Sequence, residues 1–258
     1  MTELFDTHAH YDDEAFDADR EELLGQFPKQ GIARIVNIGA SLASCRKTID
    51  LMEKYPYIYG AVGIHPNETA ELTEESFAWL KAQCSHKKCV AVGEIGLDYY
   101  WDEPEREVQK KWFVRQLHLA RELSLPVVIH SRDAAKDTAD IMQAEKAGEI
   151  GGVVHCYSYT KELAKTFLDM GFYFGIGGVI TFKNARKLKE AVEYIPLDKI
   201  VLETDCPYLA PEPNRGKRNS SLNLPYVAAA IAALKGIPEE EVRKAAWENA
   251  VKLYRMES

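Results

Sequence analysis

The segment Pro126–Arg132, with the sequence PVVIHSR, opens on an uninterrupted apolar run and ends in a histidine, a serine and an arginine. Strands that are covered on both faces have continuous apolar runs of this kind, whereas half-exposed strands alternate apolar and polar residues. Similar short apolar segments recur along the chain. We therefore expect eight buried strands, at Leu4–His8, Arg34–Ile38, Ile58–Ile64, Cys89–Ile95, Val127–His130, Val153–Cys156, Tyr173–Ile176 and Ile200–Thr204.

Amphipathic stretches between these segments predict helices, the clearest of them at Glu105–Leu123, with two more, Asn223–Lys235 and Pro238–Met256, after the last strand. Strands that alternate with helices are typical of a parallel sheet. An open doubly wound sheet would give a similar pattern, but eight units in 258 residues match the length of about 250 residues that one closed barrel needs. The sequence thus predicts an α/β protein, a TIM-type (β/α)8 barrel with an extra C-terminal helix, as a single domain over residues 1–258.

Composition narrows the classes of function. The 40 acidic and 32 basic residues give a net charge of -8, which disfavours broad electrostatic adhesion to nucleic acid. It leaves a nuclease possible, since bound cations add positive charge locally. The five cysteines form no pair of C-x-x-C motifs, and no run approaches the about 18 apolar residues of a membrane span. We expect a cytoplasmic enzyme that needs neither a membrane nor an obligate protein partner.

Histidines and acidic residues gather where the predicted strands end, and active sites of barrels lie at that edge. His8 and His10 are two residues apart, so that their side chains point the same way and can share one ion. His130 or His155 alone would suit a buried core position. Together, however, four imidazoles and two carboxylates predict a metal centre, made of His8, His10, Glu94, His130, His155 and Asp205.

Six ligands exceed the needs of one tetrahedral zinc ion, so we expect two divalent ions about 3.5–4 Å apart. Glu94, at the end region of the fourth predicted strand, is the expected bridge between them. Nitrogen ligands favour zinc, manganese, iron or cobalt over magnesium. The sequence leaves the choice among magnesium, manganese and zinc open.

Four segments and a basic loop carry a resemblance to a known family: FDTHAH at 5–10, GEIGLDY at 93–99, PVVIHSR at 126–132, LETDCPYLAP at 202–211 and RGKRN at 215–219. In order and spacing, this chain resembles the TatD family of metal-dependent deoxyribonucleases. The resemblance implies a barrel of the amidohydrolase superfamily. It also implies His8, His10, Glu94 and Asp205 around one metal, and Glu94, His130 and His155 around the other.

Three positions depart from the usual pattern of that family: Tyr11 follows the H-x-H motif where a small aliphatic residue is common, Tyr159 replaces a glycine, and Ser220–Ser221 replace Glu-Pro. None is an expected metal ligand. We expect all three near the mouth that selects substrates.

Several residues are candidates for holding substrate. Arginine and lysine match the oxygens of phosphate, which makes the basic positions either phosphate contacts or solvated loop residues. His65 either contacts the phosphate, supports a ligand, or forms a rigid turn with Pro66, and Glu203 either orients a ligand or pairs with a base. Tyr99, Tyr100 and Trp101 either stack on bases or pack. The candidate substrate-binding residues are His65, Arg132, Arg215, Lys217 and Arg218.

These patterns together predict phosphodiester hydrolysis. Two ions would activate a water, Asp205 would accept its proton, and Glu94 would complete the catalytic pair. The resemblance implies a 3'-5' exonuclease on single-stranded DNA, with RNA or tRNA as further nucleic acid substrates. A metal-dependent ester or amide hydrolase, such as a D-aminoacyl-tRNA deacylase, is the alternative within the fold. A metal-binding scaffold without turnover is disfavoured because the ligand set is complete.

Overall fold

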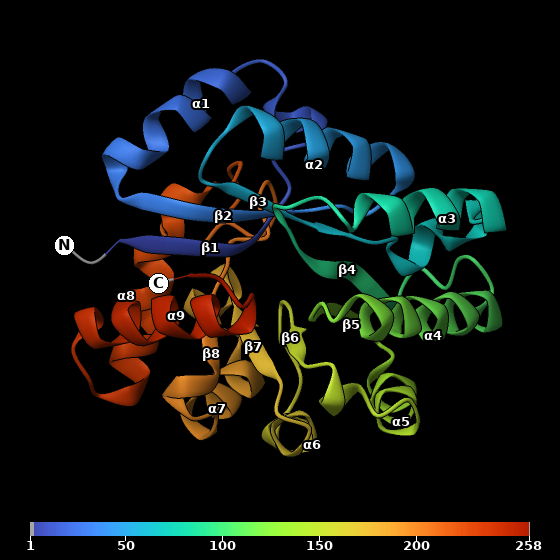
Figure 1. The fold of residues 1–258 in the computed structure, drawn as a ribbon. Coiled ribbons are helices and arrows are strands. Elements are labelled where there is room, and N and C mark those ends of the chain that lie inside the picture. The colour runs from blue at the N-terminus through green and yellow to red at the C-terminus, as the bar shows by residue number, and fades with distance from the viewer. Residues whose placement is uncertain (1–2, 258) are drawn as a thin grey trace.

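The computed structural model describes residues 3–257 and confirms the TIM-type barrel. Its strands are parallel and neighbour one another in chain order, from β1 to β8 (Figure 1). The bounds of the strands are β1 Leu4–Ala9, β2 Ile32–Ile38, β3 Ile58–Val62, β4 Cys89–Asp98, β5 Val127–Arg132, β6 Gly152–Val154, β7 Tyr173–Ile176 and β8 Ile200–Leu202.

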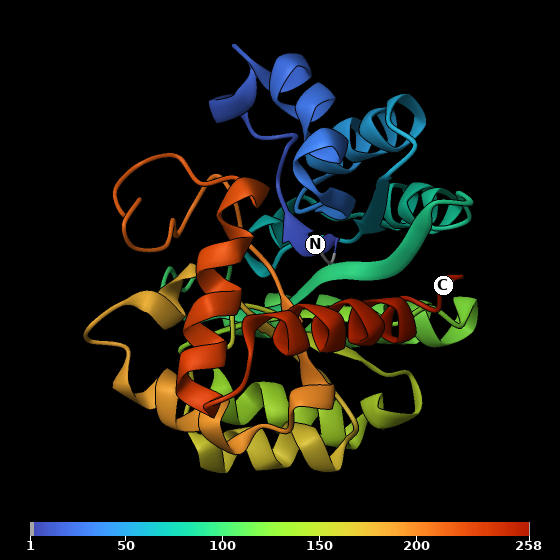
Figure 2. The same ribbon diagram turned by 90° about the vertical axis from the view of Figure 1, so that its left-hand side faces the viewer.

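A helix follows each strand and lies on the outside of the barrel, as the view along the barrel shows (Figure 2). These helices are α1 Arg20–Gln26, α2 Leu42–Lys54, α3 Glu74–Gln83, α4 Arg106–Leu123, α5 Ala135–Ala144, α6 Lys161–Asp169, α7 Arg186–Tyr194 and α8 Leu224–Lys235. The extra C-terminal helix is α9, Glu239–Leu253. Glu105, Asn223 and Pro238, expected as first residues of helices, are N-caps instead. No helix within residues 3–257 is long and apolar enough to cross a membrane.

Six strands end at residues other than those predicted on the side that carries the site: β1, β4 and β5 end later, and β3, β6 and β8 end earlier. β4 continues to Asp98 rather than ending at Ile95, because residues 95–98 pair in register with residues 129–132 of β5. β6 and β8 end earlier than predicted, at Val154 and Leu202. The residues that follow them bend out of the ladder, since Cys156 has φ +45° and Asp205 has φ +55°.

The barrel closes between β1 and the segment that follows β8. The Asp205 amide donates to the His8 carbonyl at 2.9 Å, and the His10 amide donates to the Cys206 carbonyl at 2.8 Å. Ala9 and Cys206 form a parallel bridge at the same place. This seam holds the backbone of three site residues in register.

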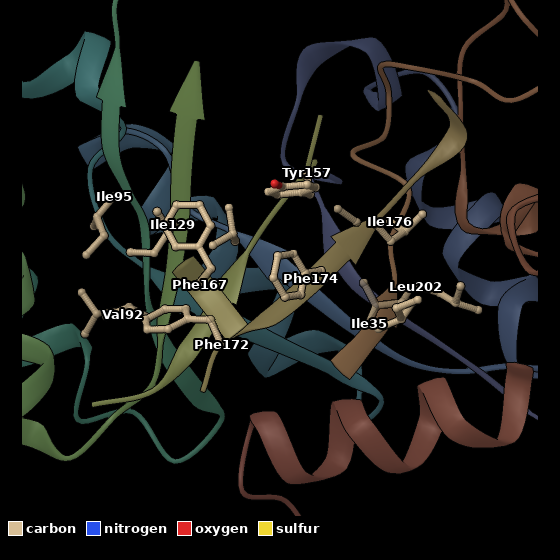
Figure 3. Packing of buried hydrophobic residues seen from close by; sticks show 14 of the residues in the cluster. Ile35, Val92, Ile95, Ile129, Tyr157, Phe167, Phe172, Phe174, Ile176 and Leu202 are labelled. Atoms are coloured by element: carbon tan, nitrogen blue, oxygen red, sulfur yellow. The ribbon is translucent and has the colours of Figure 1, made fainter. Parts of the chain in front are cut away.

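Apolar side chains fill the space between strands and helices, where Phe167, Phe172 and Phe174 are fully buried (Figure 3). A second cluster joins side chains of β1–β6 and β8 with Ala250, Leu253 and Tyr254 at the end of α9. Figure 2 shows α9 crossing the end of the barrel at which the strands begin. The barrel is therefore covered at that end, and the open end is the one that carries the histidines.

Candidate metal centre

The structure brings the six expected ligands together at the carboxyl ends of the strands. His8 lies in β1 and His10 just after it, Glu94 lies within β4, and His130 lies in β5. His155 follows β6 and Asp205 follows β8. His8, Glu94 and His155 are buried, whereas the side chains of His10, His130 and Asp205 are 13%, 14% and 16% exposed. The cluster thus lies below an opening to solvent.

Glu94 lies at the centre of this cluster and presents each carboxylate oxygen to a different group of side chains. Its Oε2 is 3.1 Å from His8 Nε2 and 3.8 Å from His10 Nε2. Its Oε1 is 2.8 Å from His130 Nδ1 and 3.3 Å from His155 Nε2. Asp205 Oδ1 joins the first group, 3.6 Å from His8 Nε2 and 3.4 Å from His10 Nε2.

The spacing of the nitrogens suits divalent cations. Ligands that share a tetrahedral ion at about 2.0–2.1 Å lie about 3.3 Å from one another. His8 Nε2 and His10 Nε2 are 3.2 Å apart, and His130 Nδ1 and His155 Nε2 are 3.1 Å apart. The sets His8–His10–Glu94 and Glu94–His130–His155 each have donor atoms close enough to hold an ion.

Two of these imidazoles have a hydrogen-bond partner on the ring nitrogen that faces away from Glu94, and this partner orients the ring. His10 Nδ1 is 3.0 Å from the Ile38 carbonyl, which requires a proton on Nδ1 and leaves the lone pair on Nε2. His130 Nε2 is 3.2 Å from Asp98 Oδ2, which leaves the lone pair of His130 on Nδ1. When each imidazole is neutral, its lone pair is therefore on the nitrogen that faces Glu94, as metal ligation requires.

Without ions, protons supply the positive charge that the carboxylates attract. Burial disfavours charged imidazoles, yet the hydrogen bond to Asp205 raises the pKa of His10 to about 10. Against the same burial, hydrogen bonds to Asp98 and Glu94 raise the pKa of His130 to about 9. His8 shows the reverse, because burial and the nearby charge of His155 lower its pKa to about 4. Divalent ions would replace the protons on His10 and His130.

Glu203 lies beneath the cluster and is fully buried. Its Oε1 accepts the Cys156 amide at 2.6 Å and is 3.9 Å from His155 Nδ1. Burial, together with the charge of Asp205, holds the pKa of this carboxyl well above its usual range. Gly175 makes room for it, since a Cβ there would lie 1.9 Å from Glu203 Oε2. Glu203 therefore supports the backbone beside His155, and its contacts within residues 3–257 include no arginine or lysine.

A cleft of about 840 Å³ opens above the cluster, and His65 and Arg132 line it. His65 Nε2 is 3.4 Å from Glu94 Oε1, and burial with the charge of His130 lowers the pKa of His65 to about 3. The Arg132 guanidinium stacks on the Tyr100 ring at 3.7 Å. Trp101 lines the same cleft and is 65% exposed. Both candidate residues therefore reach the space in which a substrate would lie.

The basic loop lies apart from the cleft lining. Arg218 forms hydrogen bonds of 2.7 and 2.5 Å with the two carboxylate oxygens of Asp19, which precedes α1. Arg215 stacks on Phe182 at 4.2 Å and is about half exposed. Lys217 is exposed. The loop is thus a candidate for contacting a long substrate outside the cleft, and Arg218 is already held by a carboxylate.

Two of the positions that depart from the family pattern, Tyr11 and Ser221, are not at the mouth, contrary to our expectation. Tyr11 and Ser221 are fully buried, and the Tyr11 hydroxyl accepts the Ser221 amide at 2.8 Å. Ser221 Oγ in turn donates to Asp6 at 2.6 Å. Tyr159 lies beside the cleft, because its hydroxyl is 3.1 Å from the Oγ of Ser131, which lines the cleft. Tyr11 and Ser221 therefore compensate each other, because both belong to one buried hydrogen-bond network.

Two buried carboxylates near the site were missed by the sequence analysis. Asp98 faces His130, and Asp12 lines the cleft while accepting Asn37 Nδ2 at 2.9 Å and Ser44 Oγ at 2.6 Å. The signal for Asp98 was available, since it lies four residues after Glu94 on the same face of a strand. Asp12 follows the H-x-H motif by two residues in a loop, where no periodicity points to its orientation.

Comparison with known proteins adds a family match over nearly the whole chain. The sequence matches the family described as TatD related DNase over residues 5–255. It is 44% identical to the uncharacterized metal-dependent hydrolase YabD of Bacillus subtilis, covering 98% of this chain and 99% of the relative. It is 34% identical to the uncharacterized metal-dependent hydrolase YcfH of Escherichia coli, covering 99% and 97%. The crystal structure of YJJV, a TatD homologue from Escherichia coli, superposes with a TM-score of 0.92 at 30% identity, covering 98% of both chains.

Proposed function

This chain belongs to the TatD related DNase family and is a metal-dependent hydrolase, and on that premise we propose that it cleaves phosphodiester bonds of single-stranded DNA with two divalent ions. The observation that carries the proposal is that the two carboxylate oxygens of Glu94 face separate groups of expected ligands. His8, His10 and Asp205 would hold one ion with Glu94. His130 and His155 would hold the other with Glu94, and magnesium, manganese and zinc are the ions to compare.

The charges of the cleft support a role for ions in binding phosphate. Carboxylates of Asp12, Asp13, Asp98 and Asp205 line the cleft, and Arg132 is the one arginine or lysine among its lining residues within 3–257. A phosphodiester would be repelled by such a surface unless cations were bound there. Divalent ions at the centre would lower the pKa of a water and offset negative charge on the phosphate.

The side chains of the chain have separate roles in this proposal. Asp205, the more exposed of the two central carboxylates, accepts the proton of the attacking water. His65 donates a hydrogen bond to a phosphate oxygen. Its Nδ1 accepts the Asn67 amide at 3.2 Å, so a neutral His65 carries its proton on Nε2, which faces the cluster. Arg132 contributes a second donor at the mouth.

Exposed aromatic rings at the rim suit a single strand rather than a duplex. Trp101 and Tyr208 line the cleft and are 65% and 54% exposed. Unpaired bases can stack on such rings, whereas bases in a duplex are already stacked. We propose removal of nucleotides from the 3' end, with RNA as a second substrate.

Labelled substrates test the proposal directly. Metal-loaded protein would be incubated with 3'-labelled and 5'-labelled single-stranded DNA and, separately, with D-aminoacyl-tRNA. We expect early release of the 3' label as mononucleotide and stepwise shortening of the 5'-labelled strand. The variant Glu94→Gln, prepared identically, controls for contaminating nucleases. Deacylation of the tRNA with intact DNA would contradict the proposal and favour a carboxylic ester hydrolase.

A further inference from the structure

Asp98 connects the second pair of ligands to the rim of the cleft. It is the last residue of β4, is 1% exposed, and uses its two carboxylate oxygens differently. Oδ2 is 3.2 Å from His130 Nε2. Oδ1 accepts the backbone amides of Tyr100 and Trp101 at 2.9 and 3.1 Å, which holds the turn at residues 99–101, here called the rim turn.

The backbone of Asp98 is fixed as firmly as its side chain. Its amide donates to Gln109 Oε1 at 2.9 Å, and its carbonyl accepts Gln109 Nε2 at 3.1 Å. Gln109 is fully buried on α4. The carboxylate therefore cannot turn away from His130 without breaking the hydrogen bonds of the rim turn.

We propose that Asp98 is a positioning residue that selects the tautomer of His130 and thereby maintains the second ion site. A carboxylate only accepts hydrogen bonds, so it requires a proton on His130 Nε2. The lone pair is then on Nδ1, 2.8 Å from Glu94 Oε1, where a shared ion would lie. The inference rests on the proposed two-ion site. It gives the Asp98 side chain two roles, which are to maintain the second ion site and to hold the rim turn.

A third ion between His65, Asp98 and His130 would be the competing interpretation, since their donor atoms are close enough to hold one. Two contacts oppose it. Neutral His65 carries its proton on Nε2, because Nδ1 accepts the Asn67 amide at 3.2 Å. His130 would also have to lose the proton on Nε2 while Nδ1 binds the second ion, which would require an imidazolate. The geometry favours a hydrogen bond over a third ion.

Two substitutions separate the parts of the proposal. In Asp98→Asn the amide oxygen still accepts the Tyr100 and Trp101 amides, but the amide nitrogen faces His130 Nε2 and donates to it. The proton of neutral His130 then moves to Nδ1, where it blocks ligation. In Asp98→Ala both the rim turn and His130 lose their partner.

The measurements are metal stoichiometry and the two zinc dissociation constants, obtained by titration calorimetry on the full chain. For Asp98→Asn we expect the first constant to change less than about threefold, and the second ion to bind about 10- to 100-fold more weakly, as for other partners of metal ligands. Asp12→Asn is the matched control, because it removes one carboxylate charge from the same cleft without contacting His130. If the second ion binds equally more weakly in both variants, the loss of a negative charge explains the effect, and the proposal is overturned.

A measurement on the unaltered protein keeps the proposal testable if the variants fold poorly. In zinc-loaded protein labelled with ¹⁵N-histidine, we expect His130 to carry its proton on Nε2 and to bind zinc through Nδ1. A proton on Nδ1, or binding of the second ion in Asp98→Asn with unchanged affinity, would overturn the assignment. Neither readout uses a substrate, so failure of DNA cleavage with these results intact would refute the proposed function alone.

Discussion

Replacing Asp205 by asparagine separates its role as a base from its role as a ligand. Asparagine keeps the side-chain volume and one coordinating oxygen, and it tolerates the left-handed backbone at φ +55°. It cannot accept a proton from the attacking water. Loss of a positioned base costs about 10²–10⁴ in rate. That loss corresponds to about 2.7–5.4 kcal/mol of transition-state stabilisation, at about 1.36 kcal/mol for each factor of ten.

His155→Ala is the matched comparison, because we expect His155 to act as a metal ligand and not as a base. Its Nε2 is 3.3 Å from Glu94 Oε1 and 3.1 Å from His130 Nδ1, so its removal takes one of three expected ligands from the second ion. The remaining ligands should still bind that ion when it is supplied in excess. Activity of His155→Ala should therefore recover in part as metal is raised, whereas Asp205→Asn should recover hardly at all.

The assay is kcat on single-stranded DNA across a metal titration, with bound metal measured in each sample. Full recovery of Asp205→Asn at high metal would refute the assignment of Asp205 as the base. Glu203 or bulk water would then have to take the proton. Equal amounts of bound metal in the inactive Asp205→Asn and in the active parent protein would support the assignment of Asp205 as the base.

Three further predictions concern the ions and the basic loop. Chelation should abolish activity and manganese or magnesium should restore it; full activity with less than one ion per chain would contradict this. Neutralising Arg215 and Lys217 together should raise KM for DNA and flatten its salt dependence, with turnover of a small phosphodiester unchanged; equal losses on both substrates would exclude phosphate contacts. Arg218→Ala should lower the melting temperature by about 2–4 °C, as expected for about 1 kcal/mol in a chain of this size. The hydrogen bond to Arg218 lowers the pKa of Asp19, so this difference is present above pH of about 4 and should shrink as acid protonates Asp19; a difference unchanged at pH 2.5 would assign the effect to packing.

The metal cluster was accessible from sequence because local rules determine where its members lie. His8 and His10 are two residues apart at a strand end, and each remaining ligand ends an apolar run or follows it within three residues. Parallel strands bring such ends to one edge of the sheet. The gathering of these residues at one edge could be predicted without any long-range contact, and their role as metal ligands is still a prediction.

Long-range partners explain what the sequence did not reveal. Arg218 looked like a phosphate contact within a basic loop, and its pairing with Asp19 spans 199 positions. Tyr11 and Ser221 looked like separate departures at the mouth, yet they form a buried pair 210 positions apart. Asp98 was missed because β4 was predicted to end at Ile95, whereas its pairing with β5 continues as far as Arg132.

The seam between β1 and the segment after β8 has a consequence for the order of events during synthesis. The chain emerges from the ribosome with its N-terminus first. His8 and His10 therefore emerge about two hundred residues before Asp205, the residue expected to complete their site. The hydrogen bonds between His8 and Asp205 and between His10 and Cys206 can form only when the last strand has emerged. A nascent chain therefore offers the cell's metal pool only fragments of this site, and the full set of ligands arises at the step that closes the barrel. If the cluster binds ions as we propose, the choice of ion would then be made by the closed barrel, in a cavity whose size and charge are already set.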